Sequence, residues 1–169
     1  MSNNVLYFIW RQPVTTDFKI ELSQQHKTGI PGIDAQHKEL LIMIDGFIDS
    51  LKNNNPSTDI IHDTIQEILG ALRSHFATEE SLLEMIAYPK LDEHKSQHKN
   101  FINMITGELE ILENTDNSKI CRFIHSYRHI ALTHIAVFDR EYTDFIEQLM
   151  CARKKFKISA IQAIKAIAG

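Results

Sequence analysis

The chain has 169 residues, of which 43% are hydrophobic and 24% are charged, a composition typical of one globular domain with a sizeable core. Its six glycines and four prolines are few, which favours long helices over many short strands. No apolar run reaches the roughly 18 residues of a membrane span, and the N-terminal run VLYFIW lacks the basic flank of a signal peptide.

Charge is spread unevenly along the chain. Residues 153–169 contain five basic side chains and no acidic one, whereas the first 152 residues contain 13 basic and 22 acidic side chains. Such an acidic body argues against nucleic-acid binding. The two cysteines, Cys121 and Cys151, fall in one expected helix, so we expect them to stay unpaired, as in a reducing cytoplasm.

Four amphipathic helices are predicted in chain order. Residues 1–30 show no clean period and are expected to form an N-terminal arm, which ends in the turn GIPGID. Apolar residues then recur at helical spacing over residues 33–51, 61–86, 91–112 and 120–149, with Ser57 or Asp59 as the expected cap of the second helix. The pattern predicts an all-α, up-down-up-down four-helix bundle over residues 31–150.

Residues 151–169 form a basic tail that reads as an extra C-terminal helix. Basic residues beside apolar ones suit a membrane-surface helix, but they also suit a helix that packs on its own acidic bundle or on a second copy. The arm and the tail are therefore the expected surfaces for a homo-oligomer or a protein partner.

Seven polar side chains interrupt the apolar stripes. A lone histidine on such a face is usually an ordinary hydrogen-bonded core residue. Seven polar residues with no Lys or Arg in the same stripes would make a poor core, because buried carboxylates are costly unless they are paired. A bound metal turns that cost into binding energy. The seven are His37, His75, Glu79, His94, His98, His134 and Asp139.

The spacing of these residues supports a metal site. His75 and Glu79 stand four residues apart, as do the two histidines of HKSQH, so each pair projects from one helical face. Five imidazoles and two carboxylates suit two metal ions with bridging carboxylates.

His134 and Asp139 depart from this spacing. They stand five residues apart, or about 140° round an ideal α-helix, so both cannot face the core. We predict a π-bulge within residues 134–139, which would restore their alignment.

Four motifs carry a resemblance to a known family. TGIPGIDAQHKEL, HFATEE, HKSQH and HIAVFDREY resemble the hemerythrin family, in the bacterial form called bacteriohemerythrin, over about residues 28–150. One His, then H-x3-E, H-x3-H and H-x4-D occur in the family's order. The resemblance implies two non-haem iron ions joined by a bridging oxo or hydroxo group, and reversible O2 binding for storage, delivery or sensing.

The resemblance also assigns the ligands. One iron would be held by His94, His98 and His134. The other would be held by His37 and His75, with an open position for O2. Glu79 and Asp139 would bridge the two ions.

The expected O2 pocket is lined by Phe76, Ile130, Ala131 and Ile135. Phe76 and Ile135 match the family's apolar lining, but Ile130 and Ala131 stand where the family usually has Trp and Leu. Because Ala131 is smaller than Leu, we expect a roomier and wetter pocket and faster oxidation to di-iron(III).

Two alternatives stay open beside the oxygen-binding protein. One is a di-iron redox enzyme acting on peroxide, NO or Fe(II), which Ala131 favours and the lack of an evident catalytic residue beyond the ligands disfavours. The other is an interaction module whose arm or tail docks according to the state of the metal. Zinc or manganese could fill the same ligands, because affinity alone does not select iron.

Overall fold

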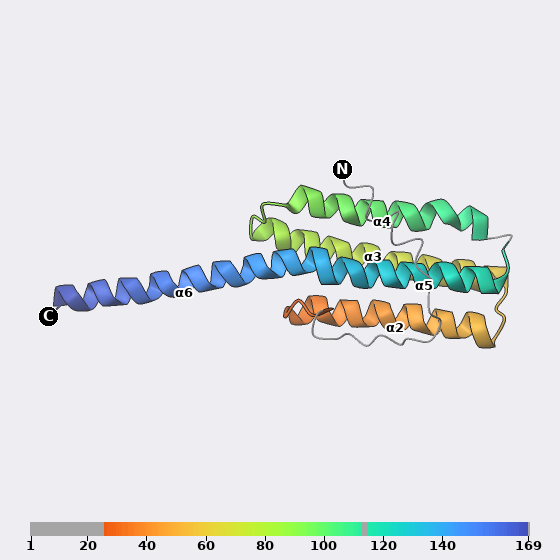
Figure 1. Ribbon diagram of the computed structural model, residues 1–169, viewed down its shortest axis with the longest axis horizontal. Coiled ribbons are helices and arrows are strands. Elements are labelled where there is room, and N and C mark those ends of the chain that lie inside the picture. Colours follow the sequence, from red (N-terminus) through yellow and green to blue (C-terminus); the bar gives the residue numbers. More distant parts are fainter. Residues whose placement is uncertain (1–25, 113–114, 169) are drawn as a thin grey trace.

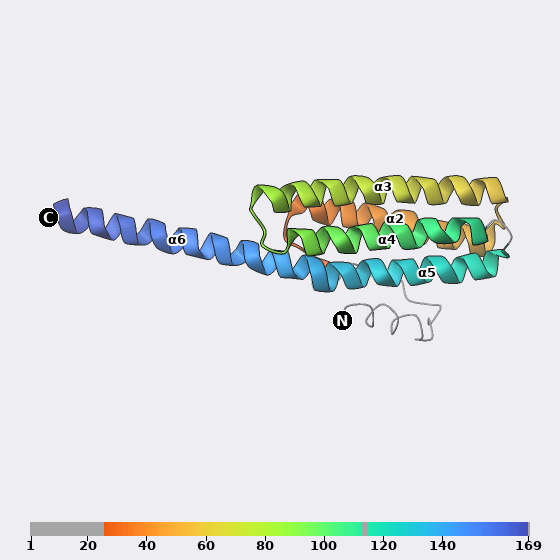
Figure 2. The ribbon, with the colours of Figure 1, turned by 90° about the horizontal axis from the view of Figure 1, so that it is seen from above.

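The structure is a computed structural model that describes residues 26–112 and 115–168. Four antiparallel helical segments lie side by side (Figures 1 and 2). They are α2 (Pro31–Asn53), α3 (Thr58–Met85), α4 (Leu91–Leu112), and a fourth segment made of α5 (Asn117–His134), η2 (Ile135–Asp139) and α6 (Arg140–Ala168). The described residues contain no strand, and the predicted all-α up-down-up-down bundle is confirmed.

The helix starts follow from local side-chain chemistry. Gly29 has φ +74°, a conformation that favours glycine. Asp34 accepts hydrogen bonds from the backbone N–H of Thr28 and Gly29 and from the Thr28 hydroxyl at 2.8–3.1 Å, which fixes the entry into α2. Ser57, one of the two predicted caps, caps α3, and Asp116 caps α5. Each side chain accepts a hydrogen bond from the backbone N–H of the residue three positions later.

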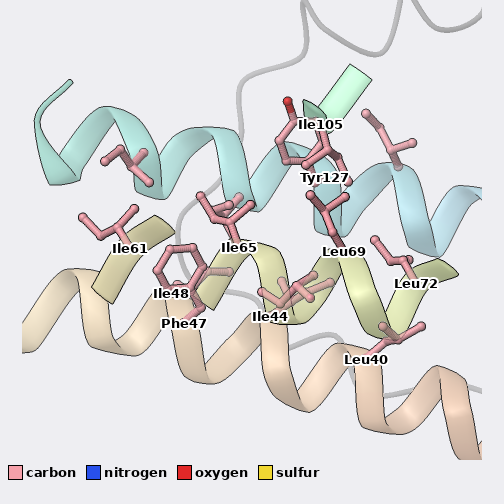
Figure 3. Close-up of a cluster of buried hydrophobic side chains, with 14 of the residues drawn as sticks. Leu40, Ile44, Phe47, Ile48, Ile61, Ile65, Leu69, Leu72, Ile105 and Tyr127 are labelled. Atoms are coloured by element: carbon pink, nitrogen blue, oxygen red, sulfur yellow. The ribbon is translucent and has the colours of Figure 1, made fainter. Parts of the chain in front are cut away.

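The core consists of two apolar clusters. The larger one fills the space between α2, α3, α4 and α5, where residues such as Ile44, Leu69 and Tyr127 meet (Figure 3). The smaller one contains Leu83 and Tyr142 and lies near the α3–α4 turn. Along α3 the polar residues of the predicted metal site fall between these clusters, so apolar packing fixes the site from both sides.

The fourth helical segment contains the predicted π-bulge. η2 is a π-helical turn over Ile135–Asp139, directly after His134, so this prediction is confirmed. A π-helical turn contains more residues than an α-helical turn, so residues five apart can lie on the same side. His134 and Asp139 therefore both face the core, where their exposed fractions are 8% and 0%.

The C-terminal tail is helical, as predicted, but it is not a separate helix. α6 continues from the bundle to Ala168 without a break and projects away from the other helices (Figures 1 and 2). Residues 1–25 of the predicted arm lie outside the described residues. Both cysteines are free, Cys121 buried and Cys151 exposed. Within residues 26–112 and 115–168, no helix has the length and hydropathy to cross a bilayer.

Leu69 tests the account of the core. Its side chain is 0% exposed, so Leu69→Ala should lower the free energy of unfolding by about 2–5 kcal/mol through lost burial and a residual cavity. Ile42 is 61% exposed on α2, and Ile42→Ala should change it by less than about 0.5 kcal/mol. Urea denaturation measures both, and equal losses would contradict this packing.

Candidate metal centre

All seven predicted ligands converge in the bundle core. α2 supplies one, α3 and α4 supply two each, and the α5–η2 segment supplies two, so each of the four helical segments contributes. None is more than 8% exposed. Their elements are far apart in the sequence, and only the antiparallel bundle brings them together.

The candidate ligand atoms form two groups that share one carboxylate. Side-chain oxygen or nitrogen atoms within 4.8 Å of one another join Glu79 to three histidines, His94, His98 and His134. A second group joins Glu79 to His37 and His75. Each group has the composition of a small metal site, and the shared carboxylate lies where it can bridge two ions.

Asp139 links the same two groups. Its Oδ2 lies 3.3 Å from His37 Nε2, and its Oδ1 lies 3.1 Å from His134 Nε2. Neither oxygen has a hydrogen-bond partner among the described residues, although both are buried. A buried carboxylate with free lone pairs is costly unless a cation takes them, so Asp139 fits a second bridging position.

The histidine rings are oriented with Nε2 inward. The outer nitrogen Nδ1 of His75 lies 3.2 Å from the side-chain oxygen of Gln36, and Nδ1 of His98 lies 2.8 Å from a carboxylate oxygen of Glu80. Because both partners accept hydrogen bonds, Nδ1 carries the proton and the Nε2 lone pair points into the site. Sequence reasoning missed Gln36 and Glu80, although each is the chain neighbour of a predicted ligand.

The inward nitrogens crowd one another. Nε2 atoms face each other at 3.1 Å in the pair His37–His75 and again in the pair His98–His134. Two imidazole lone pairs at this distance repel unless a proton or a metal ion lies beside them. The donor set therefore fits a pair of metal ions, and imidazole with carboxylate is a suitable set for iron.

Tyr142 completes the surroundings of the shared carboxylate. Its hydroxyl donates a hydrogen bond to Glu79 Oε1, which leaves Oε2 beside the histidines at 3.1 Å from His98 Nε2 and 3.2 Å from His94 Nε2. The Tyr142 side chain is fully buried, and burial together with the Glu79 charge raises its pKa. The tyrosine thus stays a proton donor to Glu79. Its signal in the sequence is its place three residues after Asp139.

The electrostatics follow from burial. Desolvation lowers the pKa of His75 to about 4, although the Glu79 charge opposes this. Burial raises the pKa of Glu79, but its contacts with His94 and His98 outweigh this effect and hold that pKa well below its usual value. Burial likewise opposes ionisation of Asp139, but the neighbouring His134 outweighs this effect and lowers its pKa.

A cavity of about 20 Å³ adjoins the site. Because one water needs about 10–15 Å³, it suits a molecule of one or two heavy atoms. Three predicted lining residues, Phe76, Ala131 and Ile135, do line it. Ile130 does not line this cavity and packs in the larger apolar cluster, and its place in an O2 pocket stays a prediction.

The rest of the cavity lining was not predicted. It consists of Leu40, Leu41, Ile44, Leu72 and Phe101 beside His37, His75 and His134. Helical spacing could have found Leu40 and Leu41, which stand three and four residues after His37, and Phe101, which stands three after His98. Phe76 stacks on His98 with ring centroids 3.8 Å apart, so the lining also holds a ligand ring in place.

Glu80 offers a test of ring orientation. Glu80→Ala should weaken metal affinity about 10–100-fold, because His98 loses the acceptor that fixes its tautomer. Competition with a chelator under anaerobic conditions measures the Fe(II) affinity. Glu84→Ala, an exposed glutamate one turn further along α3, is the matched control. Equal affinities in the two variants would contradict the role of Glu80.

The His75 pKa predicts the acid sensitivity of the metal-free protein. The ordinary pKa of histidine is 6.5, and the pKa of His75 in the folded chain is about 4. Between these two pH values His75 is protonated in the unfolded chain and neutral in the folded chain. Stability should therefore fall as pH drops through this range, on the order of 3 kcal/mol in total. Urea denaturation from pH 7 to 4.5 in chelator measures the slope, which His75→Gln should flatten. A slope unchanged in the variant would disprove the assignment.

The comparisons with known proteins agree with this geometry. A bacteriohemerythrin of Clostridium acetobutylicum is 29% identical over 126 residues, 71% of this chain and 95% of that protein. One of Stenotrophomonas maltophilia is 28% identical over 120 residues, 70% and 76% of the two chains. One of Pseudomonas aeruginosa PAO1 is 35% identical over 79 residues, 47% and 50%. Residues 28–149 match the Hemerythrin HHE cation binding domain, and the chain therefore belongs to the hemerythrin family.

Proposed function

We propose that this protein binds O2 reversibly at a non-haem di-iron centre, for storage, delivery or sensing. His94, His98 and His134 would hold one iron, His37 and His75 the other, and Glu79 and Asp139 would bridge them. When bound, the iron pair with its bridging oxo or hydroxo group supplies the electrons that O2 binding requires. The names of the relatives and the family match support this class of function.

The observation that carries the proposal is the position of the cavity. It is lined by His37 and His75, which belong to the group with only two histidines. That group has room for a further ligand, and the adjoining space suits a diatomic molecule. Of the three-histidine group, His134 also lines the cavity, whereas His94 and His98 do not.

The protein's own residues prepare this site in two ways. Apolar side chains such as Leu40, Leu72 and Phe101 line the cavity and exclude water, which would otherwise compete for the open position and promote oxidation. Gln36 and Glu80 hold protons on the outer nitrogens of His75 and His98, so the inner nitrogens stay free for a metal.

A redox enzyme that acts on peroxide, NO or Fe(II) is the second candidate. The observation in its favour is Ala131, a half-buried residue that lines the cavity and fills less space there than a larger side chain would. Against it, the described cavity lining contains histidines and apolar residues but no other side chain able to donate a proton.

An oxygen cycle separates the two candidates. Protein reconstituted with Fe(II) without air should gain a visible ligand-to-metal charge-transfer band when O2 is admitted and lose it under vacuum, over repeated cycles. Direct and irreversible passage to the di-iron(III) spectrum would reject reversible binding. Catalytic consumption of peroxide or NO with an added reductant would then favour the enzyme.

Ala131→Leu should slow oxidation of the oxygenated protein to di-iron(III) severalfold, because the larger side chain fills the cavity and excludes water. The decay of the oxygenated spectrum in air measures this rate. Ala77→Leu, which adds the same side chain on the exposed face of α3, is the control. If both variants decay like the parent protein, Ala131 does not control access.

A further inference from the structure

The apolar stripe of α6 continues beyond the end of the bundle. Inside the bundle, Tyr142, Phe145 and Ile146 pack with Leu83 near the α3–α4 turn. Further along the same side of the helix come Leu149 and, two turns later, Phe156. In contrast to Tyr142, which is fully buried, these side chains are 44% and 78% exposed. The side of α6 that is packed against other helices inside the bundle is therefore exposed to solvent at Leu149 and Phe156, beyond the end of the bundle.

The projecting part of α6 does not fold back on the helices of the bundle. Figures 1 and 2, viewed 90° apart, both show it extending away from α2, α3 and α4. Residues 150–168 span about 28 Å at the helical rise of 1.5 Å per residue. Most of the stability of helices in proteins comes from packing of an apolar face, so a packing partner is expected for this segment. In this conformation the chain's own bundle is therefore not the packing partner of the projecting segment.

The charges along this part of the structure are self-complementary. The projecting segment carries Arg153, Lys154, Lys155 and Lys157, all exposed. The end of the bundle that α6 leaves is acidic: residues 84–93 and 140–147 present six exposed acidic and two exposed basic side chains. Two of these acids, Glu141 and Asp144, already pair with Lys90 and Arg140, and the other four have no ion-pair partner among the described residues.

We propose that two copies of the chain pair through their projecting α6 helices in antiparallel orientation. Residues 153–157 of each copy then lie opposite residues 148–152 of the other, next to its acidic bundle end, as a two-fold interface requires. Leu149 of one copy lies opposite Phe156 of its partner, so the two-fold axis passes between residues 152 and 153, and the two Ala152 residues lie beside it. A parallel pair would instead place basic segment against basic segment. An anionic lipid surface is disfavoured as the binding partner of the projecting helix. The acidic end of the bundle lies where this helix leaves the bundle, so it would repel anionic headgroups.

Cysteine cross-linking tests the orientation in the full-length chain. Cys151→Ser removes the exposed native thiol. In that background Ala152→Cys should form a disulfide-linked dimer under mild oxidation. Leu149→Cys and Phe156→Cys should cross-link efficiently when mixed and poorly when each is oxidised alone. Equal self-cross-linking at all three positions would mean a parallel pair, and no cross-linking at any would reject the pairing.

Sedimentation equilibrium tests the surface and its charges. Phe156→Glu should raise the dimer dissociation constant about 30-fold or more, as expected for loss of a central aromatic contact. Cys151→Glu introduces the same charge about 140° away round the helix and should leave the constant near that of the parent chain. Added salt should weaken the dimer. A chain that stays monomeric, or that is monomeric and sediments with phosphatidylserine vesicles, would overturn the proposal.

Discussion

The structure depends on the burial of two carboxylates, Glu79 and Asp139, at the centre of a four-helix bundle. Both are 0% exposed, and their charged neighbours within 4 Å among the described residues are all histidines. Carboxylates in such a place are strongly destabilising unless cations share them. The arrangement becomes favourable when metal ions take the remaining lone pairs, so the site and the stability of the fold are linked.

The rest of the core positions the two buried carboxylates and the histidines around them. The two apolar clusters along α3 hold the polar layer between them. The π-helical turn η2 realigns the chain so that His134 and Asp139 both face inward. Gln36, Glu80 and Tyr142 then fix the directions of the ligand atoms by hydrogen bonds. A small cavity lined by apolar side chains and by His37, His75 and His134 lies beside this layer.

The sequence predicted those features that depend on local spacing. Helical periodicity predicted the bundle, and the five-residue step between His134 and Asp139 predicted the π-bulge; the structure confirms both. The metal assignment itself stays a prediction. The roles of Gln36 and Glu80 depend on ring orientation between helices, which sequence spacing does not fix. Likewise, composition alone did not show that the basic tail continues α6 without a break.

Diffraction from crystals grown with iron, recorded on both sides of the iron absorption edge, tests the central claim most directly. The account predicts two anomalous peaks in the core of each chain. One should lie among His94, His98 and His134, the other beside His37 and His75, with Glu79 and Asp139 between them. A single peak, or peaks outside this cluster, would contradict the claim that these seven residues form one centre for two ions.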